Sequence, residues 1–190
     1  MKFRPKDEDF SVKRSMDEVL QIAQHELQKK GIDLTVTNAN DLPSTVRGDS
    51  FKFKQVLLNL LLQSISGTYK GVVKLKTEMV RHSDQPHVAV EIDNSKFELH
   101  KKDNMRIMKL SQATEFKKVL ESKVDINLKI AKILINALGW KLDFSAFKGS
   151  KFTFALPVKS DGRVPIENIP QPSAMPSTNL ITMKELENEI

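Results

Sequence analysis

The 190-residue sequence has no cysteine, which excludes disulfides, thiolate metal sites and cysteine nucleophiles together. No run of apolar residues approaches the roughly 20 that a membrane-spanning helix needs. The first nine residues are polar and lack the apolar stretch of a secretion signal. The four histidines also show no spacing typical of metal ligands; they are His25, His82, His87 and His100. We therefore expect a soluble, cytoplasmic protein without a membrane segment.

Aromatic residues are few, at 6% of the chain, and they fall where a core would need them rather than along a basic stripe. The net charge of +6 taken alone suggests a nucleic-acid partner. However, lysines and acidic residues are interspersed in most segments, as on an ordinary solvated surface. We therefore rank nucleic-acid binding as the weakest functional hypothesis, because it depends on charge alone.

Composition divides the chain into two parts. Residues 1–158 have the apolar content of one folded domain, whereas residues 159–190 begin as a proline-rich linker with Pro165, Pro170, Pro172 and Pro176. The last apolar and acidic segment, residues 180–190, is compatible with a short docking helix.

Hydrophobic periodicity predicts the elements of the folded part. Three amphipathic helices are expected: one capped by Ser15 with Glu18, one over residues 49–65, and one over residues 125–138 with Ile126 and Ile130 facing inward. Strands are expected at residues 32–36, 72–80 and 88–93, followed by a hairpin of 140–144 with 151–156. One or two short helices are expected between residues 94 and 122. This order describes a two-layer α/β sandwich, with a mixed sheet packed on about three helices.

Four segments then resemble a known family. Residues 55–65, preceded by Gly48 and Asp49, resemble the N-box helix of histidine-kinase-type ATP-binding domains (HATPase_c, of the Bergerat or GHKL superfamily). The strand that ends at Asp93, the helix that ends before Gly139 and residues 149–157 continue the likeness in the family's order. The resemblance covers residues 10–157 and implies the Bergerat fold of histidine-kinase-like ATPases.

The resemblance implies a nucleotide site whose magnesium ligand is changed. The family's N-box asparagine coordinates Mg²⁺, and Gln63 occupies its position here, with Asn59 one turn earlier on the same helix face. Glutamine still offers an amide oxygen, but its extra methylene displaces that oxygen and Mg²⁺ tolerates misplaced ligands poorly. The family's phosphate-facing cation is replaced by Ser66. For buried Asn59 and Gln63, a structural hydrogen-bond partner and a metal ion stay equally open.

The adenine-binding box is also altered. The family has an aspartate followed by two glycines at alternate positions, and Asp93 with Asn94 suits the beginning of this pattern. Ser95 and Phe97 stand where the glycines belong, so backbone cannot lie against a purine as it does in the family. Asp93 as a simple turn former and Asp93 as a retained adenine contact are both open.

The glycine-rich lid box is missing from the expected place before the third helix. Residues 123–128 contain no glycine, and Asp125 brings a negative charge to the position where phosphates approach in the family, although it is a good helix cap. Gly149 and Ser150 match the family's last box, but they also suit an ordinary hairpin turn. His25 lies inside the first helix, and we expect it to be an exposed residue rather than a phosphoacceptor.

The sequence thus favours a degenerate ATP-binding domain, a pseudokinase that serves as a structural or regulatory protein-interaction module, with no catalytic residue of its own. The nucleotide-binding positions by resemblance are Asn59, Gln63, Asp93, Asn94, Gly149 and Ser150, and Gln63 is the candidate Mg²⁺ ligand. ATP and Mg²⁺ binding is expected to be weak or lost, and protein partners in a larger assembly are expected. The alternative is an active ATP-binding domain of a two-component sensor histidine kinase.

Overall fold

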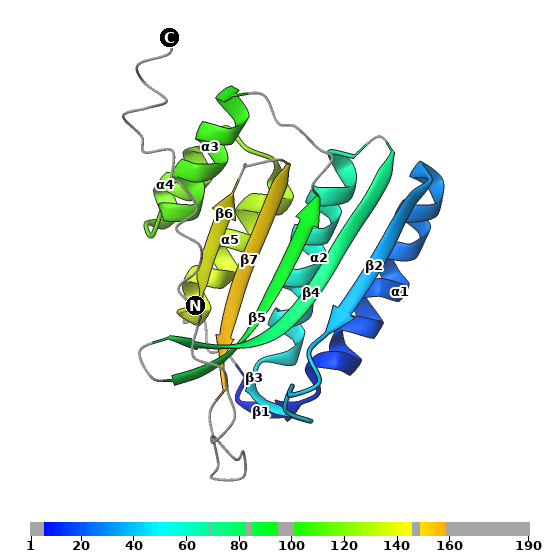
Figure 1. The fold of residues 1–190 in the computed structure, drawn as a ribbon. Helices are drawn as coiled ribbons and strands as arrows, with labels where there is room; N and C mark the ends of the chain where they lie inside the picture. The colour runs from blue at the N-terminus through cyan, green and yellow to red at the C-terminus, as the bar shows by residue number, and fades with distance from the viewer. Residues whose placement is uncertain (1–5, 69, 83–84, 95–100, 146–148, 159–190) are drawn as a thin grey trace.

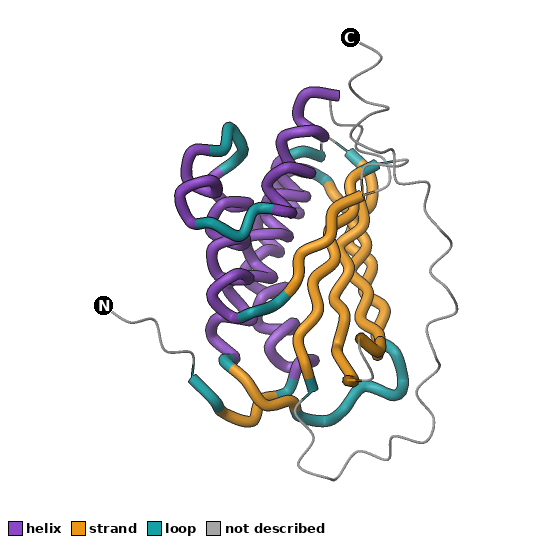
Figure 2. The backbone as a smooth tube through the Cα atoms, turned by 90° about the vertical axis from the view of Figure 1, so that its left-hand side faces the viewer, coloured by secondary structure: helices purple, strands orange, loops and turns teal. Residues whose placement is uncertain are grey.

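The computed structural model describes residues 6–68, 70–82, 85–94, 101–145 and 149–158. Among these residues, the helices lie on one face of a five-stranded sheet and no helix covers the other face (Figures 1 and 2). The elements are β1 (Glu8–Phe10), α1 (Val12–Lys30), β2 (Ile32–Asn38), β3 (Val46–Gly48), α2 (Ser50–Ser66), β4 (Gly71–His82), β5 (Gln85–Asn94), α3 (Lys101–Gln112), α4 (Phe116–Glu121), α5 (Ile126–Leu138), β6 (Lys141–Ser145) and β7 (Ser150–Pro157). The predicted two-layer α/β sandwich is confirmed.

The main sheet is mixed and has the strand order β2-β4-β5-β7-β6. Strand β2 pairs with β4 in parallel, and the other neighbours are antiparallel. Strands β1 and β3 form a separate two-stranded sheet. The predicted β6–β7 hairpin is confirmed by its register, in which Leu142 lies opposite Phe154.

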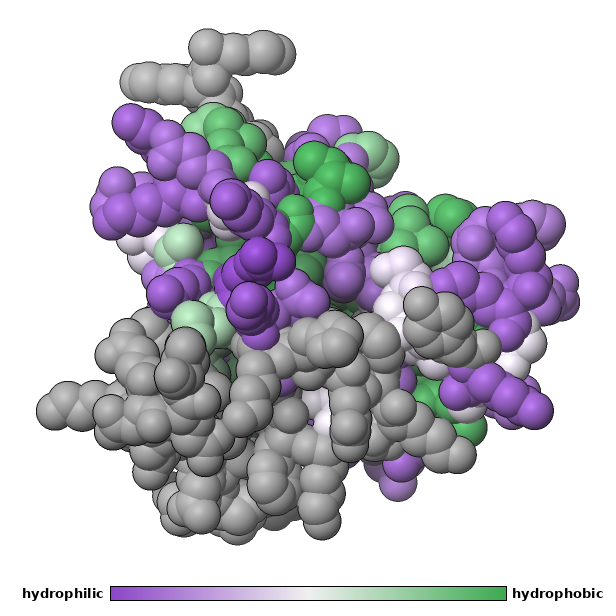
Figure 3. All heavy atoms as spheres, turned by 90° about the horizontal axis from the view of Figure 1, so that it is seen from above, coloured by the Kyte–Doolittle hydropathy of each residue, from purple (hydrophilic) through white to green (hydrophobic). Residues whose placement is uncertain are grey.

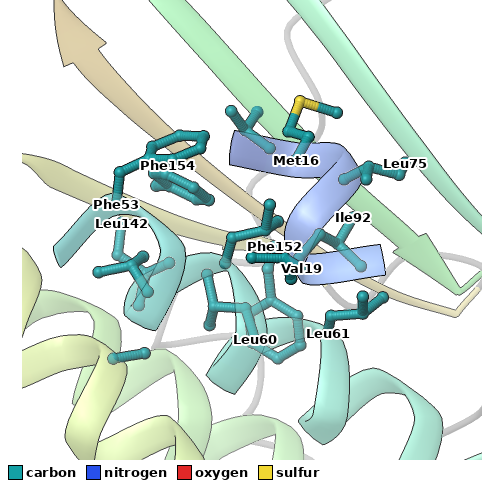
Figure 4. Close-up of a cluster of buried hydrophobic side chains, with 14 of the residues drawn as sticks. Met16, Val19, Phe53, Leu60, Leu61, Leu75, Ile92, Leu142, Phe152 and Phe154 are labelled. Atoms are coloured by element: carbon teal, nitrogen blue, oxygen red, sulfur yellow. The ribbon is translucent and has the colours of Figure 1, made fainter. Parts of the chain in front are cut away.

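Helix α2 lies in the middle of the helix layer, between α1 and α5, and is buried against the sheet, as its nearly all-round apolar sequence predicts (Figure 1). Phe53, Leu60 and Leu61 are each 0% exposed, and they lie against the sheet residues Phe152, Phe154, Ile92 and Leu75 (Figure 4). The predicted cap is confirmed too, because one Asp49 carboxylate oxygen accepts from the Lys52 N–H at 2.9 Å. The central helix is therefore fixed both at its beginning and along its length.

Helix α1 begins four residues earlier than predicted. Its N-cap is Ser11, whose Oγ accepts from the Arg14 N–H at 3.3 Å, and Ser15 is buried inside the helix. The predicted capping box was wrong because the Glu18 carboxylate makes an ion pair with Lys54 of α2, at 2.7 Å, instead of turning back to the backbone. That ion pair holds the pKa of Glu18 below its ordinary value.

Helix α5 spans nearly the predicted residues but turns a different side to the core. Ile126 and Ile130 are 62% and 38% exposed, so their predicted inward placement was wrong. The buried side consists of Leu128, Ala131, Lys132, Leu134 and Ile135. The helix carries two apolar stripes at helical spacing, and the packing of α2, α3 and α4 around it decides which of them is buried.

Candidate functional site

Of the predicted site residues, Asn94 and Ser150 lie where the carboxyl end of α2 meets the end of β5 and the start of β7. Asn94 and Ser150 are opposite each other in register and are 0% and 2% exposed. The Asn94 side-chain amide donates to the Ser64 carbonyl at 3.1 Å and to the Thr68 hydroxyl. Thr68 in turn donates to the same Ser64 carbonyl at 2.7 Å. Asn94 thus ties the end of β5 to the end of α2.

Asn59 and Gln63 lie one turn apart on α2 and are both half-buried. The Asn59 amide donates to the Gln55 carbonyl at 2.7 Å within its own helix. The Gln63 Oε1 and Asn94 Oδ1 atoms are buried and have no hydrogen-bond partner among the described residues. Two unsatisfied carbonyl oxygens near the end of one helix are unusual, because buried acceptors are normally paired.

Asp93 does not belong to this group. Successive strand residues point to opposite faces of the sheet, and the neighbouring Ile92 and Asn94 are both buried on the helix side. Asp93 lies opposite Lys74 and Lys151 in register, on the uncovered face. On the same face Lys151 makes an ion pair with Glu91 at 3.1 Å. The structure therefore separates Asp93 from Asn59, Gln63 and Asn94.

A signal for this separation was present in the sequence. Val88, Val90 and Ile92 alternate along β5 and are 0% exposed, and the next position in this alternation is Asn94 rather than Asp93. The helix-facing polar residue at the end of the strand is thus an amide with a structural partner. Ser95 and Phe97, which replace the family's glycines, lie outside the described residues.

Gly149 has a backbone φ of 115° and is buried immediately before β7. This φ lies in the region that favours glycine, so the residue type is explained by the local backbone alone. His25 is exposed on α1, as expected.

The N-terminus of α5 is occupied by a side chain of the chain itself. The Asp125 carboxylate accepts from the Asn127 N–H at 2.7 Å, which confirms the predicted cap. A helix N-terminus attracts anions through its unpaired N–H groups and its dipole. Here a carboxylate already satisfies one of these donors and places negative charge at that end.

Helices α3 and α4 are fastened to α5 by side chains that the sequence analysis did not single out. Lys132 donates to the Ser111 carbonyl at 2.6 Å, and Lys129 donates to the Leu120 carbonyl at 2.9 Å. Asn136 donates to the Ala113 carbonyl at 3.0 Å. These bonds satisfy carbonyls at the ends of α3 and α4, where intrahelical partners run out.

Lys132 is unusual because it is 4% exposed, and burial lowers its pKa, with a small opposing effect of Asp143. It lies four residues after Leu128 and three before Ile135, both buried residues of α5. The position of Lys132 within the apolar spacing of α5 was therefore the sequence signal for this buried contact.

The side chains at the predicted magnesium position are the amides of Asn59 and Gln63. The oxygens without a partner near the end of α2 belong to side-chain amides. No group of three or more His, Asp or Glu suited to a metal ion occurs in the described part of the chain. Ser66, at the position of the family's cation, donates its hydroxyl to the Gln63 carbonyl at 2.9 Å. At the predicted phosphate position, the Asp125 carboxylate accepts from the Asn127 N–H at the beginning of α5.

Curated histidine kinases are similar to this chain in sequence, although no family model matches it. The signal transduction histidine-protein kinase BarA of Escherichia coli K12 is 25% identical over 181 residues, which is 93% of this chain and 19% of BarA. The sensory/regulatory protein RpfC of Xanthomonas campestris is 28% identical over 95% of this chain and 27% of RpfC. The chain thus corresponds to about a fifth to a quarter of these relatives.

Solved structures with the same fold include catalytic parts of histidine kinases. The catalytic domain of histidine kinase ThkA, in a nucleotide-free form, has a TM-score of 0.60 at 22% identity, covering 80% of this chain and 96% of that domain. Full-length ShkA in complex with AMPPNP has a TM-score of 0.63 at 16% identity, covering 83% of this chain and 32% of ShkA.

In the described part of the chain, none of the helices combines the length and apolar character needed to cross a bilayer. The likeness in sequence extends over most of the chain, and the likeness in fold is to histidine-kinase catalytic domains. Both agree with the order of motifs in the sequence. The chain is therefore related to the histidine kinases and resembles their ATP-binding domain in sequence and fold.

Proposed function

We propose that this chain is a degenerate histidine-kinase-like ATP-binding domain, a pseudokinase that works as a structural or regulatory protein-interaction module. The observation that carries the proposal is the Asp125 carboxylate bonded to the N-terminus of α5, where a triphosphate would need free N–H groups. Binding of ATP with Mg²⁺ is weak or lost, and the chain transfers no phosphoryl group. The proposed location is the cytoplasm.

The bonds from α5 to the neighbouring helices support the proposal. A nucleotide lid has to move between open and closed positions to admit and hold its ligand. Here three α5 side chains hold the ends of α3 and α4, and Lys132 does so from a buried position. Moving α3 away from α5 would leave a buried lysine and a helix-end carbonyl unpaired, which costs free energy.

The interaction role is supported by apolar side chains on the outer faces of α4 and α5. Phe116 and Leu120 are 60% and 47% exposed, and Ile126 and Ile130 are 62% and 38% exposed. Each pair is spaced by four residues and so lies on one side of its helix, and the two helices pack together. Several exposed apolar side chains on adjoining helices are typical of a protein contact surface. The relatives are larger sensor kinases, so a further part of such an assembly is a natural partner.

One observation favours the alternative, an active ATP-binding domain of a sensor histidine kinase. The Gln63 Oε1 atom is buried without a partner at the position of the family's magnesium ligand. A bound cation would satisfy it. We place this second because a single amide oxygen cannot compensate for the changed phosphate side.

Isothermal titration calorimetry with ATP and Mg²⁺ tests the proposal. We expect no saturable heat with the unchanged chain and none with Asp93→Asn. A micromolar dissociation constant would contradict the pseudokinase reading and favour the alternative. Asp125→Gly serves as a sharper variant, since it removes the competing carboxylate. A gain of binding in that variant alone would identify Asp125 as the blocking group.

A further inference from the structure

Helices α3 and α4 border a groove of about 520 Å³. None of the residues that line it belongs to the predicted nucleotide site. Its floor includes Leu110 and Ala113, and its rim carries Arg106, Lys109, Lys118 and Lys123 against the single acidic residue Glu121. Figure 3 views the molecule from the end that carries α3, and there hydrophilic residues surround smaller hydrophobic areas. The groove therefore suits a ligand that is apolar on one side and acidic at its edges.

The positive charge of the protein is concentrated in this region. Residues 101–123 contain seven lysines and arginines and three acidic residues, a net charge of +4 out of +6 for the whole chain. On the rim, Arg106 is paired with Asp103 and Lys118 with Glu115. Lys109 and Lys123 line the groove as well and make no ion pair with another residue that the structure describes. These two cations are the ones available to an acidic partner.

The chain itself contains a segment of the complementary kind. Residues 180–190 carry three glutamates and one lysine, a net charge of −2. Leu180, Met183, Leu186 and Ile190 follow one another at spacings of three, three and four residues. If this segment is helical, the spacing places all four on one face. Of the acidic residues, Glu187 adjoins that face, and Glu185 and Glu189 lie on the other side of such a helix.

The intervening linker is long enough for the segment to reach the groove. Val158 follows the end of β7, and α3 lies toward the opposite end of the sheet (Figure 1). The eight residues of β7 span about 26 Å at roughly 3.3 Å each. The 21 residues from 159 to 179 reach about 70 Å when extended and about 25 Å as a flexible coil.

We propose that residues 180–190 bind in the α3–α4 groove of the same molecule, with their apolar face toward the groove at Ala113 and with Glu187 near Lys109 and Lys123. The segment would act as an internal occupant of the groove, which an external partner of the same chemistry has to displace. This goes beyond the proposed function and involves no nucleotide, so the calorimetric result with ATP bears on one proposal and not on the other.

Site-specific crosslinking of the full chain tests this directly, because the sequence has no cysteine of its own. Gln112 lines the groove, so one cysteine is introduced there as Gln112→Cys. A second cysteine is introduced in the tail as Asn188→Cys. The matched control replaces Gln112→Cys by Thr35→Cys, an exposed position on β2 at the other edge of the sheet. With a short bismaleimide, we expect a crosslink within one chain at position 112 and none at position 35.

Charge reversal separates a specific contact from chance proximity. Lys109→Glu with Lys123→Glu should reduce the crosslink yield by roughly fivefold, as expected for two lost exposed ion pairs. Glu187→Lys in the same molecule should restore part of the yield. Equal yields at positions 112 and 35 would overturn the proposal. Crosslinks found only between two chains would also overturn it, since the occupant would then be a second copy.

Discussion

The end of α2 and the beginning of α5 are the two places where the family's nucleotide site would be built, and they have changed in different ways. At α2, polar residues remain on the helix side, and Asn94 joins β5 to Ser64 and Thr68. At α5, the helix is kept, but Asp125 caps it and Lys129 and Lys132 fasten α3 and α4. In the first region two buried oxygens have no partner among the described residues, whereas in the second the chain's own side chains make the contacts.

The two regions therefore differ in how their polar groups contribute to the stability of the fold. At the beginning of α5 and along it, side chains of the chain itself pair with backbone groups, and each such hydrogen bond contributes to stability. At the end of α2, the Gln63 Oε1 and Asn94 Oδ1 atoms have no partner among the described residues, so their burial costs free energy there.

The largest expected effect is at Asn94. Asn94→Ala removes both bonds to the end of α2 and leaves a buried Ser64 carbonyl and Thr68 hydroxyl less well paired, so we expect a loss of about 2–3 kcal/mol in the free energy of unfolding. Urea denaturation measures this. The control Asp93→Ala changes the neighbouring residue on the uncovered face and should cost less than about 0.5 kcal/mol. Similar costs for both variants would mean that Asn94 is not the link between these elements.

A smaller effect is expected at Lys132. Lys132→Ala removes the bond to the Ser111 carbonyl and opens space beneath α3, for an expected loss of about 1–2 kcal/mol, because removing the buried charge offsets part of the cost. Amide hydrogen exchange should rise in α3 more than in α2. The matched variant Lys118→Ala, at an exposed lysine, should leave exchange in α3 unchanged. Uniform acceleration across the protein would argue against a local role in fastening α3.

A stability change of the opposite sign is expected at Gln63, at the end of α2. Gln63→Leu removes a buried oxygen that has no partner among the described residues, so the free energy of unfolding should rise by about 1 kcal/mol. Thermal and urea unfolding without nucleotide measure this change, with Asn59→Leu as the control, since Asn59 does have a partner. Lower stability of Gln63→Leu would mean that the amide has a stabilising contact.

The smallest effect concerns His82, far from both regions. Burial, followed by the nearby His87 and Lys141 charges, lowers the pKa of His82 below its ordinary value of 6.5. The unfolded chain therefore takes up the proton more readily, and stability should fall as the pH drops below 6.5. His82→Asn should flatten this part of the stability–pH curve. An unchanged slope in urea unfolding at a series of pH values would assign the pH dependence to other groups.

The sequence predicted the architecture well because periodicity and capping are local properties. Asp49 and Asp125 cap the helices as predicted, Gly31 ends α1, and the β6–β7 hairpin forms in the expected place. Each of these depends on residues within a few positions of one another.

The predictions that were wrong concern side chains whose placement depends on elements distant in the sequence. Ser15 and Glu18 form a good local capping pattern, but Lys54 from another helix takes the Glu18 carboxylate. On α5 the sequence offers two apolar stripes, and only the neighbouring helices select the one with Leu128. For the site, Asp93 matched the family's residue type, but the alternation of β5 places Asn94 on the helix side. Tertiary pairing of Asn94 with Thr68 and Ser64 could not be predicted from spacing.

The most direct test of the central claim follows the side-chain amide signals of Gln63 and Asn94 by ¹⁵N NMR during titration with ATP and Mg²⁺. These two side chains hold the unsatisfied oxygens, so any metal–nucleotide complex at the end of α2 would move their signals. We predict that both stay unchanged up to millimolar nucleotide. A saturable shift at micromolar concentration, lost in Gln63→Leu, would contradict the account and assign a working nucleotide site to this chain.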